Sequence, residues 1–121
     1  MAKFTNDVVL DAALDKIATA TRLTVTSAQP ANFAGIAGSL LASVAVDSGD
    51  FTKANGDASG RKVTVGAQAG VSVTASGNAT HVCLDDGTTL LHVATVTSQA
   101  LTSGNTVNVG AYDVEFADVT P

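Results

Sequence analysis

The chain contains few of the aromatic and cysteine residues that many catalytic and ligand sites use. Its 121 residues include no tryptophan, one tyrosine and one cysteine, and aromatic residues make up 4%. A single cysteine, Cys83, excludes an intrachain disulfide and therefore a disulfide-stapled secreted fold. With so few aromatic residues, the core is expected to be aliphatic and of modest depth. The composition alone is thus typical of a structural protein and identifies no reaction.

Positive charge is scarce and stops halfway along the chain. Charged residues make up 14%, against about a quarter in an ordinary soluble domain. The last of the six basic residues is Lys62, so the second half carries the whole net charge of −5. Nucleic acid binding needs several cations on one face, and so does binding to an anionic membrane surface. We therefore expect neither nucleic acid nor a membrane as a direct partner.

Long apolar runs are absent as well. No segment approaches the roughly 20 apolar residues that cross a bilayer, and Asp7 and Asp11 stand where a secretory signal would be apolar. We therefore expect the protein to be made and assembled in a reducing cytoplasm. The mean hydropathy of +0.29 is nevertheless high for a soluble monomer. Either other subunits cover part of the surface, or the surface is a bland one, rich in threonine and alanine.

One amphipathic helix is expected near the N-terminus, over about residues 7–18. Its apolar positions repeat at helical spacing: Leu10, Leu14 and Ile17, with Val9 and Ala13 widening the stripe. Thr5 or Asn6 can cap its first turn. A helix of about three turns is too short to be stable alone, so we expect it to pack on the rest of the fold.

From Arg22 onward, small and β-branched residues alternate at a period of two, and turns containing glycine or asparagine interrupt them. The expected strands are 22–27, 39–46, 51–54, 61–67, 70–75, 79–85, 88–96, 106–109 and 112–119. Residues 33–38 are expected to form a loop across one end of the fold. Because no crossover helices occur, we predict a mainly β fold, an antiparallel β-sandwich or small barrel with one N-terminal helix. Residues 1–121 form a single domain.

The sharpest local signal is the dipeptide Asp86-Gly87, which favours a two-residue type I′ hairpin turn. That turn would place His81 directly opposite His92, with Cys83 on the same face. Two histidines and a cysteine could begin a zinc site, but a fourth ligand is missing. The alternative is a pair of histidines that bridges two strands at a subunit contact. We predict no metal ligand and leave metal binding by this face open.

The residue types that carry nucleophilic or acid–base chemistry form no recognisable constellation. Serine, histidine and aspartate all occur, but no Gly-x-Ser-x-Gly elbow does. Cys83, in the middle of an expected strand, is interpreted as an inert packed thiol. Asp113 and Glu115 alternate along the last strand as solvent-facing carboxylates do, without the aromatic cleft of a glycosidase. We therefore predict that the protein is not an enzyme and has no catalytic residues and no cofactor.

Two further patterns are weak. Asp47, Asp50 and Asp57 could in principle donate oxygen ligands to calcium, but they lack the spacing of an EF-hand. Gly56, Gly60 and the nearby Lys62 resemble a phosphate loop only superficially, because no helix follows them. Neither pattern is taken as a binding site.

Three sets of segments together span nearly the whole chain. The first set is Leu10–Asp15, Arg22–Val25 and Ser27–Pro30, the second is Gly49–Thr52 and Gly56–Lys62, and the third is Ser76–Val82 and Ala100–Val107. In these segments the chain resembles a family of small virion structural proteins of tailed double-stranded DNA bacteriophages. The family brings no catalytic residues with it.

The resemblance implies a capsid decoration, or cement, protein. Such a protein forms a homo-oligomer, often a trimer, on the outer capsid surface of the virion, where it binds the major capsid protein. It stabilises the shell against the pressure of packaged DNA. We expect no long N-terminal arm before the helix, so attachment would fall to the helix or to loops such as 33–38. The alternative is a tail, baseplate or fibre-associated β-module that contacts tail proteins or the host surface.

Overall fold

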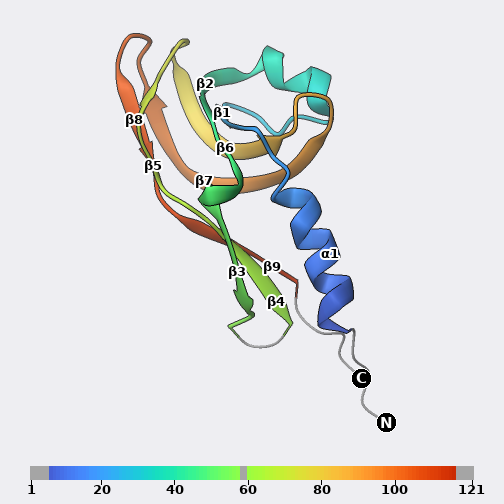
Figure 1. Cartoon of the computed structure of the whole chain (residues 1–121). Coiled ribbons are helices and arrows are strands. Elements are labelled where there is room, and N and C mark those ends of the chain that lie inside the picture. Colours follow the sequence, from blue (N-terminus) through green and yellow to red (C-terminus); the bar gives the residue numbers. More distant parts are fainter. Residues whose placement is uncertain (1–5, 58–59, 117–121) are drawn as a thin grey trace.

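The computed structural model describes residues 6–57 and 60–116, and it confirms the mainly β fold with one N-terminal helix (Figure 1). The helix is α1 (Asp7–Ile17), and the strands are β1 (Arg22–Thr26), β2 (Leu40–Ala45), β3 (Phe51–Asn55), β4 (Arg61–Val65), β5 (Gln68–Ser72), β6 (Gly77–Asp85), β7 (Leu90–Leu101), β8 (Thr106–Val109) and β9 (Tyr112–Phe116). Two short 3₁₀ helices are η1 (Phe33–Gly38) and η2 (Ser48–Asp50).

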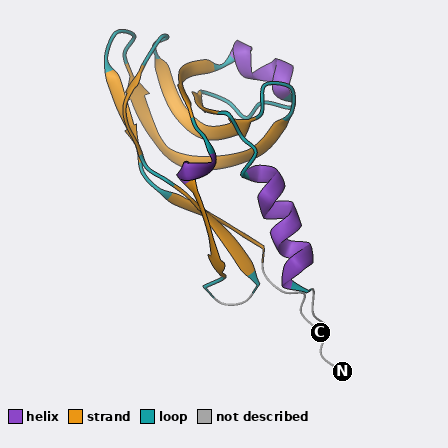
Figure 2. Ribbon diagram, in the orientation of Figure 1, coloured by secondary structure: helices purple, strands orange, loops and turns teal. Residues whose placement is uncertain are grey.

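The strands form three antiparallel sheets. The largest has the order β2-β1-β6-β7 and is strongly curved in Figure 2, and the other two have the orders β3-β4-β9 and β5-β8. A bridge between Ala42 and Val73 and a hydrogen bond of 2.8 Å from Thr74 N to Leu41 O join the outer side of β2 to the segment after β5. The opposite edge of the curved sheet is β7, and its outer side meets no partner strand among the described residues.

The helix forms where the sequence predicts it, but its buried face is narrower. Asn6 caps it, because its side-chain oxygen accepts the N–H of Val8 at 2.9 Å; the alternative cap, Thr5, lies outside the described residues. Leu10, Leu14 and Ile17 are buried. Val9 is 60% exposed and Ala13 is exposed, so the predicted widening of the stripe is wrong. The reason is that α1 packs against β4 and β7 from one side only.

The main core lies between the curved sheet, the two smaller sheets and α1. Its fully buried members are aliphatic: Leu14, Leu23, Ala42, Val63, Val65 and Leu84. The aromatic residues Phe51, Tyr112 and Phe116 are half-buried and pack against this core from its margin. The aliphatic core expected from the composition is therefore present.

The segment 33–38 is not the loop that the sequence predicts. It forms the 3₁₀ helix η1, which begins at a cap where the side-chain oxygen of Asn32 accepts the N–H of Gly35 at 2.9 Å. Ile36 of η1 is 1% exposed. The guanidinium of Arg22 lies over the Phe33 ring, 5.7 Å from its centroid, so η1 packs over the beginning of β1.

Strand boundaries differ from the predictions mainly in the β6–β7 hairpin. β6 begins two residues earlier than expected, at Gly77, and β7 extends to Leu101 because these two residues still pair. β5 begins and ends earlier than predicted, and β4 ends at Val65. The predicted end of the last strand, at residue 119, lies outside the described residues.

Candidate functional site

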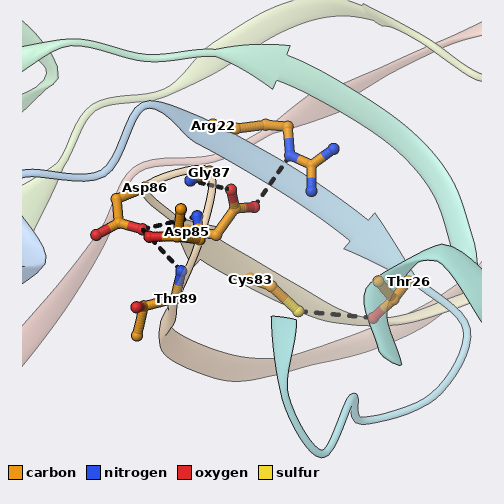
Figure 3. Close-up of polar contacts among 8 residues, drawn as sticks. Arg22, Thr26, Cys83, Asp85, Asp86, Gly87 and Thr89 are labelled. Carbon is orange, nitrogen blue, oxygen red and sulfur yellow. Dashed lines mark hydrogen bonds and ion pairs between the residues drawn. The ribbon is translucent and has the colours of Figure 1, made fainter. Parts of the chain in front are cut away.

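The β6–β7 hairpin closes through a loop of residues 86–89, longer than the predicted two-residue turn. Oδ1 of Asp86 accepts the backbone N–H of Thr89 at 2.8 Å (Figure 3) and the backbone N–H of Thr88 at 3.0 Å. Gly87 has a φ of 93°, in the left-handed region that glycine adopts without steric cost. An aspartate that accepts N–H groups two and three residues later stabilises this wider loop. The hydrogen bonds from Thr89 and Thr88 also lower the pKa of Asp86.

The wider loop changes which residues face each other across the hairpin. His81 lies opposite Thr95, and His92 lies opposite Leu84, so the predicted pairing of the two histidines is wrong. Because the partner of His81 is displaced by an odd number of positions, the two histidines lie on opposite faces. Cys83 shares the face of His81 only. No three His, Cys, Asp or Glu side chains among the described residues are placed to hold a metal ion, so the hairpin does not form the zinc geometry considered above.

Cys83 is a packed thiol, as the sequence predicts. Its side chain is fully buried, and its Sγ lies 3.8 Å from Oγ1 of Thr26 (Figure 3). Burial raises the pKa of the Cys83 thiol, and the neutral thiol is neither a nucleophile nor a metal ligand.

The two histidines have different surroundings. Nδ1 of His92 is buried without a hydrogen-bond partner in the described part of the chain, and burial lowers the pKa of this side chain. Nδ1 of His81 lies 2.8 Å from Oγ1 of Thr80. His92 is therefore a neutral packing residue at pH 7.

Unlike Asp113 and Glu115, Asp85 does not face solvent. It is fully buried, with its Oδ2 3.0 Å from Nε of Arg22 and its Oδ1 accepting the N–H of Gly87 at 3.0 Å (Figure 3). A buried charge is tolerated only when it is paired and hydrogen-bonded. The pair therefore anchors β1 to the start of the β6–β7 loop.

The aspartates considered for calcium make local contacts instead. Oδ1 of Asp47 accepts a backbone N–H of η2 at 2.9 Å, and Oδ2 of Asp50 accepts the N–H of Asp47 at 2.9 Å. Asp57 lies 2.8 Å from Nζ of Lys62, which also lies 3.1 Å from Asp113. The lysine that a phosphate loop would use is thus engaged by two carboxylates.

Asp113 and Glu115 face solvent on β9, as predicted. Oδ1 of Asp113 accepts the hydroxyl of Thr64 at 2.7 Å, and this bond together with that from Lys62 lowers the pKa of Asp113. Glu115 accepts the backbone N–H of Asp57. Both carboxylates therefore fasten β9 to its neighbours.

A groove of about 550 Å³ opens between β7 and the stretch that runs from β8 to the first residues of β9. Residues 94–97 and Gln99 of β7 line one side, and residues 107–113 line the other. Val25 and Val82 of the curved sheet also line it. Among the described residues, the ionisable side chains that line it are Asp113, which is already bound to Lys62 and Thr64, and Tyr112, whose pKa burial raises. Such a lining suits contact with another protein segment.

Beside this groove, β7 presents an exposed and uncharged edge. Residues 95–100 are all exposed, and residues 87–112 contain no Asp, Glu, Lys or Arg. Sequence reasoning missed this surface. The uncharged run can be read directly from the sequence, but alternation alone does not say which strand ends a sheet. We call residues 95–100 of β7, together with the groove, the β7 seam.

Comparisons with protein-family models, with curated proteins and with solved structures found no match for this chain. The resemblance to phage virion proteins therefore rests on the sequence segments alone. In the described residues, no helix has the length and apolar character needed to span a membrane.

Proposed function

We propose that this protein is a structural subunit of a tailed-phage particle, and specifically a capsid decoration protein that binds the outer shell as a homo-oligomer. The observation that carries this proposal is the β7 seam, an exposed and uncharged strand edge beside an open groove. Long unprotected edges of this kind are uncommon in monomeric proteins, because they offer unpaired backbone groups to other chains. The phage setting comes from the resemblance described above.

The distribution of charge supports a protein partner over a polyanion. Each of the basic side chains in the described residues takes part in an ion pair: Lys16, Arg22, Lys53, Arg61 and Lys62. A protein that binds nucleic acid needs such cations for phosphates. That nucleic acid is not a direct partner stays a prediction.

A decoration protein acts through the contacts it adds and not through a reaction. Each subunit that spans neighbouring capsid subunits buries additional interface, and a specific interface buries on the order of 1,600 Å². Repeated over a shell, such contacts oppose outward pressure. A rigid β fold with an aliphatic core suits this role, because it transmits load without rearranging.

The test is the number of copies per particle. Virions of the encoding phage would be purified and separated into heads and tails, and the protein would be quantified in each fraction. We expect hundreds of copies in heads, and we expect particles that lack the protein to release their DNA at lower temperature. Copies confined to tails would favour the tail module instead. Absence from particles would contradict any structural role in the virion.

A further inference from the structure

The outer edge of β7 is free over most of its exposed length. β6 pairs with one side of β7 from Gly77 to Asp85, and no strand of the described chain pairs with the other side. A strand edge that lacks a partner leaves backbone N–H and C=O groups pointing outward. These groups form a template onto which another strand can add.

The adjacent strand does not fill this place. A turn containing Gly104, whose φ is 92°, connects β7 to β8, and such a short connection usually leaves two strands side by side. Here β8 pairs with β5 instead. The space between β7 and β8 is the groove of about 550 Å³. The sandwich is therefore open along one side.

The edges formed by β2, β3 and β9 are charged or covered. β3 carries Lys53, which lies 2.6 Å from Asp15, and β9 carries Asp113 and Glu115. The outer side of β2 is covered where Thr74 donates to Leu41. Charged side chains on an edge oppose pairing with another chain. β7 has none between residues 87 and 112.

The occupant that fits this edge is a second copy of the chain. The net charge of −5 makes two copies repel each other over most of their surfaces, and β7 is a place where they can meet without placing like charges opposite each other. An isologous contact requires a patch that is complementary to itself. Residues 95–100, Thr-Val-Thr-Ser-Gln-Ala, meet this requirement, because threonine and serine side chains form favourable cross-strand pairs with one another.

We propose that two copies associate about a two-fold axis through antiparallel pairing of their β7 strands. The two curved sheets then form one continuous sheet, and each copy closes the open side of the other. This inference rests on the proposed role of the β7 seam as an assembly surface. It replaces the trimer that the family resemblance implies with a dimer.

The test compares the same substitution on two strand edges. Thr97→Lys adds a positive charge to the exposed part of β7, and Thr52→Lys adds the same charge to an exposed position of β3. The mass of the full-length chain would be measured by light scattering across a range of concentrations. We expect the wild type and Thr52→Lys to be dimers. We expect Thr97→Lys to raise the dimer dissociation constant by about a hundredfold or more, because like charges would meet across the axis.

Circular dichroism would verify that each variant is folded, and Thr95→Lys serves as a second β7 variant if Thr97→Lys does not fold. A monomeric or trimeric wild type would overturn the proposal. So would equal dissociation constants for Thr97→Lys and Thr52→Lys. A monomer that still binds capsids would refute the self-association but not the decoration role. A dimer that is absent from virions would refute the decoration role but not the self-association.

Discussion

The strands β9 and β7 both end a sheet, but they present different surfaces to solvent. β9 carries Asp113 and Glu115, and Lys62 and Thr64 of the neighbouring strand β4 hold Asp113 in place. β7 is longer, and its exposed residues 95–100 carry no charge. Charge on an edge strand keeps other chains away, and its absence permits pairing. The comparison supports the proposal that β7, and not β9, is the edge to which another chain adds.

The two regions also differ in how the chain is held within the molecule. Near β9, ion pairs such as Arg61 with Asp11, at 2.8 Å, link α1 and the β3-β4-β9 sheet at the surface. At the β6–β7 hairpin, Asp85 is fully buried and pairs with Arg22 of β1 at 3.0 Å, while Lys16 of α1 lies 3.9 Å from Asp86 at the surface. The pair that involves buried Asp85 holds the hairpin loop, whereas the surface pairs link α1 to the sheets.

Removal of the Arg22 side chain should destabilise the protein more than the other substitutions considered below. Arg22→Ala leaves Asp85 buried without its counter-charge, and we expect the free energy of unfolding to fall by about 3 kcal/mol. The control is Lys53→Ala, which removes the solvent-exposed pair with Asp15 and should cost less than about 1 kcal/mol. Urea denaturation of both variants measures the difference. Equal losses would show that the buried pair has no special role.

The dependence of stability on pH should show separate contributions from His92 and from two aspartates. Burial lowers the pKa of His92 below its usual 6.5, so below that pH the unfolded chain binds more protons and stability falls as pH decreases. The pKa values of Asp113 and Asp86 are lowered below their usual 3.8. Their contribution is present above that value and is lost as pH falls through their folded pKa values.

Thermal melting between pH 8 and pH 2 should therefore show two declines. His92→Asn should remove the first decline, and Asp113→Asn should reduce only the second. The result that would count against this assignment is a first decline that persists unchanged in His92→Asn.

A weaker effect, on self-association, is expected when β9 is made to resemble β7. The double substitution Asp113→Ser and Glu115→Thr removes both carboxylates from the edge, and we expect weak further association of the protein at high concentration. Asp7→Asn with Asp15→Asn removes the same charge from α1 and serves as the control. Sedimentation velocity measures the association. If both double variants associate equally, net charge rather than edge charge is responsible.

Much of the fold follows from local sequence patterns, because small and β-branched residues alternate within most of the strands. The positions of α1 and of most strands could be predicted in this way. The His81–His92 pairing could not, since the register depended on how Asp86 accepts hydrogen bonds from Thr88 and Thr89, a contact that the Asp-Gly dipeptide does not reveal. The β7 seam was hidden for a different reason. Sequence shows that residues 87–112 are uncharged, whereas only the sheet order shows that β7 is an edge.

Backbone amide hydrogen exchange can check the claim that the β7 edge is an assembly surface. Exchange would be measured for the full-length protein at low and high concentration, with β9 as the internal reference. We predict that amides within residues 95–100 become protected as concentration rises, while those of β9 exchange at the same rate throughout. The claim would be contradicted if exchange in β7 changed neither with protein concentration nor on addition of purified capsids.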